Sequence, residues 1–253
     1  MISIKDIVAL QRDKKSRERI GAFFVDGVNM VKQAIEKDWP IKQLVVVDEL
    51  VDNEYKKEIL AKIDHAKIMH VDKRNYEKLA TKKMIQGMGA VVEFKKQNFR
   101  DGIVVVLENP RDPGNLGTIM RSMLALGCFN LIIVKPCTDI HHPETIRASM
   151  GAILHMRIVL VENLVEAFSL VAKLNYENLV FDKARATSRL KEKANTISRM
   201  DKKAIWFGNE GAGVSEAVLN KNNPVIAIET SSDVDSLNLA EAVSIGLYTL
   251  LKP

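Results

Sequence analysis

Three loops carry the residue types that could do chemistry. They are NPRDPGNLGTIMRS (109–122), FGNEGAGVS (207–215) and IETSSDVDSLN (228–238). Each leaves an apolar stretch that is typical of a buried strand, and each then enters a helix or a turn. In open α/β sheets, ligands bind outside the carboxyl ends of the strands. The three loops can therefore converge on one site, although they lie far apart in the sequence.

The first loop has the pattern of a rigid turn that begins a helix. Pro110 and Pro113 fix the backbone φ angle, and Asn115 is predicted to cap the helix by accepting its free N–H groups. Apolar residues then recur at helical spacing, at positions 116, 119, 120, 123 and 124. Arg121 lies off this stripe, so its guanidinium is expected in solvent. Taken alone, the pattern also fits a capped helix with an ordinary surface arginine.

The other two loops are weaker signals on their own. The backbone N–H groups of GNEGAG (208–213) could hydrogen-bond an anion or a cofactor, but the same pattern also fits a plain turn. The stretch lacks the lysine of a phosphate-binding loop and does not match the G-x-G-x-x-G pattern, which disfavours a nucleotide-phosphate-binding protein. In the third loop, Ser236 is a natural N-cap for the apolar helix that follows.

Strands and helices alternate along the whole chain and predict two α/β domains. Over about the first ninety residues the alternation predicts a small domain, 1–97. The polar stretch KKQNFRDG (95–102) is interpreted as a linker. A second domain, 102–253, is predicted from β-branched runs without polar alternation, which are typical of parallel strands covered on both faces. These runs lie at 103–108, 131–136, 156–161, 178–182, 204–208 and 225–229.

The composition is that of an ordinary globular protein. Of the 253 residues, 47% are hydrophobic and 27% are charged. No apolar stretch approaches the roughly 18 residues that a membrane-spanning helix needs. The N-terminus becomes charged too early for a secretory signal, so a cytoplasmic protein is expected. Cys128 and Cys137 are expected to be free thiols, and no histidine or cysteine spacing indicates a metal site.

The distribution of charge indicates a polyanionic partner. The net charge is only +5, but two runs concentrate basic residues. RDKKSRER (12–19) holds five basic and two acidic residues, and the stretch 182–203 holds eight basic and three acidic ones. Each run alone is typical of a solvated helix face. The two together favour RNA or DNA as a partner.

Taken in order, the three loops resemble the motifs of the SpoU/TrmH family of RNA 2'-O-ribose methyltransferases. The motif stretches are DPGNLGTIMR (112–121), GNEGAG (208–213) and DSLNLAEAVS (235–244). IRASMGAI (146–153) resembles the stretch that the family carries between its first and second motifs.

The N-terminal part of the chain resembles the ribosomal-protein-like substrate-binding domain of the same family. The resemblance rests on RERIGAFFVDG (17–27) and IQGMGAVV (85–92). The likeness to the family therefore covers nearly the whole chain. Three motifs in the family's order are far more specific than any one of them.

This resemblance implies a fold, a cofactor and partners. The implied fold is α/β: a C-terminal parallel sheet with a deep trefoil knot, as in SPOUT proteins, beside a small N-terminal ribosomal-protein-like domain. The implied assembly is a homodimer whose active sites lie near the subunit interface. The implied cofactor is S-adenosyl-L-methionine, bound by main-chain groups of the knotted loops. The separate N-terminal domain favours large-subunit rRNA over tRNA as the substrate.

The resemblance also implies roles for eight residues. The cofactor-binding positions correspond to Gly208, Ile228 and Leu237. The catalytic polar positions correspond to Asn115, Arg121, Glu210, Ser236 and Asn238. The third motif departs from the family pattern, because Ile228-Glu229-Thr230 and Ser232 stand where relatives commonly have Ile-Pro-Met and then a glycine.

The implied reaction is in-line transfer of a methyl group from a sulfonium to a ribose 2'-oxygen. The family proposal makes Arg121 the base, although a guanidinium with a pKa above about 12 also suits a phosphate-holding role. Glu210 is expected to orient Arg121 or its counterpart in the partner subunit. Two alternatives remain: a non-catalytic RNA-binding or ribosome-assembly protein on the same fold, favoured by the altered third motif, and a tRNA 2'-O-methyltransferase.

Overall fold

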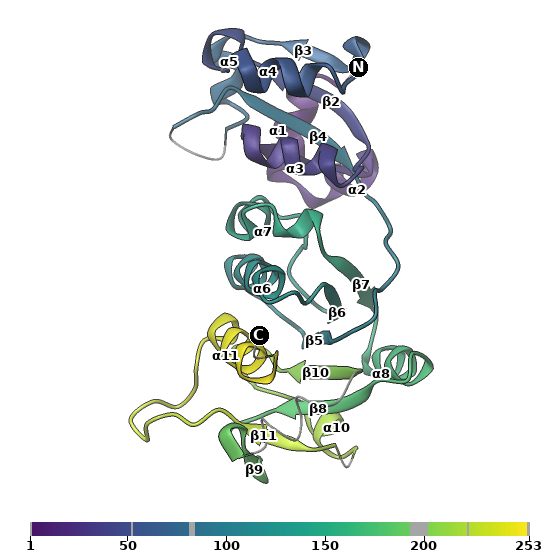
Figure 1. Ribbon diagram of the computed structural model, residues 1–253, viewed down its shortest axis with the longest axis vertical. Helices are drawn as coiled ribbons and strands as arrows, with labels where there is room; N and C mark the ends of the chain where they lie inside the picture. Colours follow the sequence, from purple (N-terminus) through teal and green to yellow (C-terminus); the bar gives the residue numbers. More distant parts are fainter. Residues whose placement is uncertain (1, 52, 81–83, 193–201, 222, 252–253) are drawn as a thin grey trace. The chain divides into compact units, whose positions relative to one another are not determined.

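The computed structural model describes residues 2–51, 53–80, 84–192, 202–221 and 223–251. The chain forms two compact units, which are described separately here (Figure 1). The first comprises Met1–Lys96 and Asp139–His155, and the second comprises Gln97–Thr138 and Met156–Pro253. Both units combine a sheet with helices, which confirms the predicted α/β class.

The first unit contains a mixed four-stranded sheet in the order β1-β4-β2-β3. Its strands are β1 (Ala22–Asp26), β2 (Ile41–Val46), β3 (Ile68–His70) and β4 (Met88–Glu93). β4 is antiparallel to both of its neighbours, and β2 is parallel to β3. The helices are α1 (Ile4–Arg12), α2 (Lys14–Ile20), α3 (Val28–Glu36), α4 (Asn53–Leu60), α5 (Lys73–Glu77) and α7 (Pro143–Ser149).

The segment Asp139–His155 folds with the N-terminal residues. Asp139 Oδ2 accepts hydrogen bonds from the buried Arg17 guanidinium, at 2.8 Å from Nε and 2.6 Å from Nη2. The Trp39 indole donates to the carbonyl oxygen of Leu154 at 2.8 Å. The sequence predicts that residues 139–155 belong to the domain 102–253. In the structure, this segment packs within the first unit. The domain limits 1–97 and 102–253 therefore stay a prediction.

His141 stacks against two aromatic rings and should make the protein sensitive to acid. Its ring centroid is 4.7 Å from that of Phe23 and 4.3 Å from that of Phe94. Burial lowers the pKa of His141 from 6.5 to about 4. The folded state therefore favours neutral imidazole. The resulting stabilisation is complete above about pH 6.5 and is lost as the pH falls towards 4.

We expect His141→Phe to remove this part of the acid sensitivity, because a phenyl ring keeps the stacking and cannot be protonated. Relative to the variant, the wild type should lose about 2–3 kcal/mol of unfolding free energy between pH 6.5 and 4. Urea unfolding at half-unit pH steps measures the difference. Parallel stability profiles for the two proteins would contradict this account.

The second unit is built on a seven-stranded parallel sheet in the order β7-β6-β5-β10-β8-β11-β9. The strands are β5 (Val104–Glu108), β6 (Asn130–Val134), β7 (Arg157–Val161), β8 (Glu177–Phe181), β9 (Ser188–Arg189), β10 (Lys203–Phe207) and β11 (Val225–Ala227). All six predicted strands are present, which confirms the parallel sheet. β9 was not predicted because its two residues are too short for a periodic signal.

Four helices of the second unit are described: α6 (Pro113–Ala125), α8 (Leu164–Lys173), α10 (Glu216–Leu219) and α11 (Leu239–Leu251). Helices α6 and α11 pack against each other, and the Ser122 and Ser244 hydroxyls hydrogen-bond at 2.7 Å. The core of the sheet includes Val106, Val180 and Trp206, each fully buried. Because the strands are parallel, the loops after β5, β10, β8 and β11 all leave the same edge of the sheet.

The basic runs are not simply solvated faces. Arg17 in the first run is 3% exposed and paired with Asp139. Lys203, at the end of the second run, is 1% exposed in β10. Residues 193–201 of that run lie outside the described residues. Cys128 and Cys137 are not joined by a disulfide, as expected. Within the described part of the chain, no helix has the length and apolarity to cross a membrane.

Candidate active site

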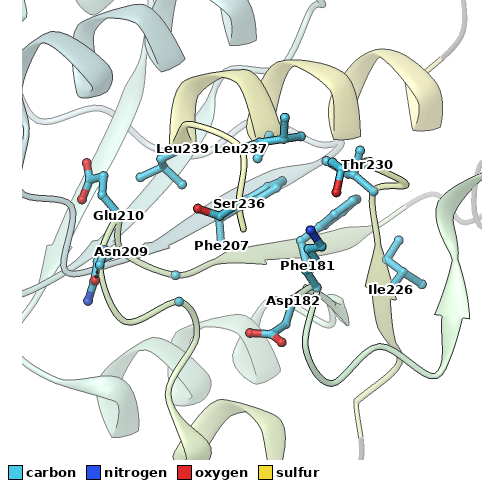
Figure 2. Close-up of a pocket in the computed structure, with 16 residues that line it drawn as sticks. Phe181, Asp182, Phe207, Asn209, Glu210, Ile226, Thr230, Ser236, Leu237 and Leu239 are labelled. Carbon is cyan, nitrogen blue, oxygen red and sulfur yellow. Dashed lines mark hydrogen bonds between the residues drawn. The ribbon is translucent and has the colours of Figure 1, made fainter. Parts of the chain in front are cut away.

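A cavity of about 190 Å³ lies at the carboxyl edge of the parallel sheet (Figure 2). Its walls come from the ends of β8, β10 and β11, the loops that follow β10 and β11, and the start of α11. Five of the eight predicted site residues line it: Gly208, Glu210, Ile228, Ser236 and Leu237. The second and third loops therefore meet in one cavity, as the sequence predicts.

The first loop reaches this site through Asn115. The expectation that Asn115 caps α6 is wrong, because the Asp112 side chain accepts from the Asn115 backbone N–H at 2.6 Å. Proline is favoured at the first helical position, so α6 begins at Pro113 and the residue before it is the cap. The Asn115 side-chain amide is therefore available for contacts with other loops.

A chain of hydrogen bonds joins all three loops. The Asn115 amide nitrogen donates to Glu210 Oε1 at 3.2 Å. The Asn238 amide nitrogen donates to Asn115 Oδ1 at 3.0 Å. Glu210 also accepts longer bonds from the backbone N–H groups of Arg111 and Asp112, at 3.4 and 3.5 Å. Three predicted polar residues are thus brought together beside the cavity.

The third loop ends in a cap that differs from the expected one. Asn238 Oδ1 accepts from the Ala240 backbone N–H at 2.8 Å, and α11 begins at Leu239. The prediction that Ser236 caps this helix is wrong, because Asn238 immediately precedes the first helical residue and has a side chain of capping type. Ser236 instead lines the cavity.

Asn238 therefore has two separable roles, and two variants should distinguish them. Asn238→Asp keeps an oxygen that caps α11 but cannot donate to Asn115, so we expect about a tenfold loss of methyl transfer with little change in melting temperature. Asn238→Ala should show the same loss and also cost about 1 kcal/mol of stability. Methyl-transfer rates and thermal melts measure the two effects. Equal melting temperatures for the two variants would contradict the assigned cap.

The glycine loop is a tight turn that satisfies its own backbone. Asn209 and Gly213 exchange two backbone hydrogen bonds at 3.2 Å, and Asn209 Oδ1 accepts from the N–H groups of Gly211 and Ala212 at 2.9 and 2.7 Å. These N–H groups are thus paired within the turn and do not form the anion cradle that the sequence suggested. A Cβ on Gly208 would lie 1.9 Å from the Gly213 carbonyl carbon, so only glycine fits there.

Arg121 is not brought to this cavity within one chain. Positions 115 and 121 are separated by about 240° around a helix, so their side chains leave α6 in different directions. Arg121 is exposed, and no residue in the described ranges forms an ion pair with it. It lies next to Ser122, where α6 meets α11.

Sequence reasoning assigned no role to several polar lining residues, among them Asp182, Lys183 and Thr230. Asp182 and Lys183 follow β8, and Thr230 lies in the third loop. Asp182 accepts from the Arg185 backbone N–H at 3.0 Å, and Lys183 Nζ donates to the Val234 carbonyl oxygen at 2.6 Å. The signal for Asp182 was present, because it ends a predicted parallel strand.

The fold is that of an α/β protein with a cavity at the carboxyl edge of a parallel sheet, the place where such proteins bind small ligands. Residues 102–248 match the SpoU rRNA methylase family, and residues 2–90 match the MRM3-like substrate-binding domain. The chain belongs to the SpoU rRNA methylase family.

Relatives of known activity and solved structure resemble nearly the whole chain. The chain is 26% identical over 240 residues to 23S rRNA (guanosine(2553)-2'-O)-methyltransferase RlmP of Bacillus subtilis, covering 94% of this chain and 91% of the relative. It is 24% identical over 250 residues to 23S rRNA (uridine(2479)-2'-O)-methyltransferase of Streptomyces viridochromogenes, covering 96% and 87%. A solved AdoMet-bound rRNA methyltransferase from Sinorhizobium meliloti has a TM-score of 0.83 at 26% identity, with 98% and 93% covered.

Proposed function

We propose that this protein transfers the methyl group of S-adenosylmethionine to a ribose 2'-hydroxyl of large-subunit rRNA. The observation that carries the proposal is the single cavity formed by the second and third motifs and hydrogen-bonded to the first motif. Family membership and two relatives that methylate 23S rRNA support the same reaction.

The lining of the cavity fits the cofactor. Phe181, Ile226 and Leu239 offer apolar surface suited to a purine ring, and Asp182 and Ser236 offer polar groups suited to hydroxyl and amino groups. Gly208, Ile228 and Leu237 would hold the cofactor in this cavity. When bound, S-adenosylmethionine supplies an electrophilic methyl group on its sulfonium. Reaction then depends mainly on positioning the donor and the acceptor.

The polar residues of the three motifs would position the RNA. Asn115, Glu210 and Asn238 form one hydrogen-bonded chain, so their side chains are held in fixed orientations before the substrate arrives. Ser236 lines the cavity beside them and would face the ribose. Arg121 would hold the RNA phosphate through its planar guanidinium or assist loss of the hydroxyl proton.

A homodimer would complete the site. Arg121 lies outside the cavity of its own chain, on the helix pair α6 and α11. On α11, Ile245 is 40% and Tyr248 60% exposed, and both lie at helical spacing on one face. Docking of two copies through this face would bury these side chains and bring Arg121 towards the cavity of the partner. The knot that the family implies would pass the chain after β11 through the preceding loops before α11 packs on α6.

The altered third motif gives little support to a non-catalytic protein. Glu229 Oε1 accepts from the Lys191 backbone N–H at 3.3 Å, and Glu229 does not line the cavity. The extra carboxylate is therefore bonded to the segment that follows β9.

Calorimetric titration with S-adenosylmethionine, followed by methyl transfer to 23S rRNA and tRNA transcripts, tests the function. The proposal predicts saturable binding and ribose methylation of the 23S transcript. Failure to bind the cofactor would refute it, and methylation of tRNA alone would refute the substrate.

A further inference from the structure

Thr230 lines the cavity, and its side-chain hydroxyl has no partner among the residues that the structure describes. Its Oγ1 atom is shielded from solvent and forms no hydrogen bond with any described residue. Buried polar groups in folded proteins are almost always paired, because an unpaired one loses its hydration without compensation. The other described side-chain atom of this kind, Ser215 Oγ, belongs to a residue that does not line the cavity. Thr230 therefore points to a ligand.

The position of Thr230 in the loop is fixed by its neighbours. The preceding residue, Glu229, is tied to the Lys191 backbone, and Ile226 pairs with β8 and β9 in the sheet. Thr230 thus directly follows a segment that is anchored by strand pairing at Ile226 and by the Glu229 hydrogen bond. A preorganised polar group of this kind can bind a ligand without an ordering cost.

The location within the cavity indicates which part of a ligand Thr230 would meet. Figure 2 shows Thr230 and Ile226 at the end of the cavity opposite Asn209 and Glu210. Glu210 belongs to the polar chain that reaches the first motif, where the RNA would react. The Thr230 end is bordered by the apolar side chains of Phe181 and Ile226. This end of the cavity therefore suits a flat aromatic ring that is apolar on its faces and polar along one edge.

We propose that the Thr230 hydroxyl hydrogen-bonds the polar edge of the cofactor's purine ring and so helps to select adenine. This inference rests on the proposed function. A hydroxyl can both donate and accept, and adenine carries ring nitrogens that accept and an amine that donates. The residue that departs from the family's usual methionine is then a specificity-determining residue of this chain.

Thr230→Val tests the contact, because valine keeps the shape of threonine and removes the hydroxyl. We expect the dissociation constants of S-adenosylmethionine and S-adenosylhomocysteine, measured by calorimetry, to rise about three- to tenfold. The melting temperature of the ligand-free protein should be unchanged or higher, because no existing hydrogen bond is lost. Thr230→Ser should bind nearly as tightly as the wild type.

A purine analogue tests the assignment to the ring edge. The wild type should bind S-adenosylhomocysteine more tightly than S-inosylhomocysteine, and this ratio should shrink towards one in Thr230→Val. Unchanged affinity in the valine variant, an unchanged ratio, or a lower melting temperature without ligand would each overturn the inference. If the wild type binds neither compound, the proposed function itself fails. If it binds both and only the variant result differs from expectation, this inference alone fails.

Discussion

Replacing Arg121 with alanine is expected to abolish methyl transfer while leaving the affinity for S-adenosylmethionine almost unchanged. Arg121 does not line the cavity of its own chain, so its loss should not disturb cofactor binding. Removing a charged group that acts on the reacting centre typically costs about 100- to 1000-fold in rate. Single-turnover methyl transfer and calorimetry measure the two quantities.

Arg100→Ala is the matched control. Arg100 carries the same charge in the same unit and lies over the Phe129 ring. Its backbone N–H bonds to Asn130 at the amino end of β6, away from the edge that holds the cavity. Methyl transfer by this control should remain near the wild-type rate. Wild-type turnover by Arg121→Ala would refute the role of Arg121.

The proposed homodimer predicts that Arg121 acts in the site of the partner subunit, and mixed dimers test this prediction. In a heterodimer, the Arg121→Ala chain keeps an intact cavity and the Glu210→Gln chain keeps an intact Arg121. Such a dimer has one complete site only if Arg121 acts in the cavity of the partner chain. If each parent homodimer is inactive, mixing the two should restore about a quarter of the wild-type activity, since about half of the dimers then carry one complete site. No recovery on mixing would place Arg121 in the site of its own chain.

Gly208→Ala is expected to have the second large effect. The new Cβ would lie 1.9 and 2.0 Å from the carbonyl carbon and oxygen of Gly213, so the backbone of the turn must move. We expect a loss of about 1–3 kcal/mol of stability and at least about a tenfold weaker affinity for S-adenosylmethionine. Urea unfolding and calorimetry provide these measurements.

Gly211→Ala provides the control within the same turn. Its Cβ would meet only Asn209 Oδ1, at an ordinary contact distance of 3.7 Å. Stability should therefore stay close to that of the wild type. If Gly208→Ala behaved like this control, the turn would not need glycine at that position.

The parallel sheet and the convergence of the loops could be predicted because both follow from local patterns. Apolar β-branched runs gave the strands, and the parallel arrangement brings their carboxyl ends to one edge. The helix caps are harder to predict than the strands, because several side chains of capping type lie within three residues of each helix start. Asp112 and Asn238 cap α6 and α11, whereas Asn115 and Ser236 were expected to do so.

Contacts between distant parts of the chain could not be predicted. The pairing of Arg17 with Asp139 joins residues 122 positions apart, and no local pattern marks it. The unpaired Thr230 hydroxyl is likewise visible only once the surrounding loops are in place. The direction of Arg121 could be predicted from the helical period, but not its distance from the cavity.

Mapping ribose methylation in the rRNA and tRNA of a strain that lacks this gene tests the central claim most directly. The account predicts that a ribose in large-subunit rRNA loses its 2'-O-methyl group, and that the wild-type gene restores it but the Arg121→Ala gene does not. An unchanged methylation map, or restoration by the Arg121→Ala gene, would contradict it.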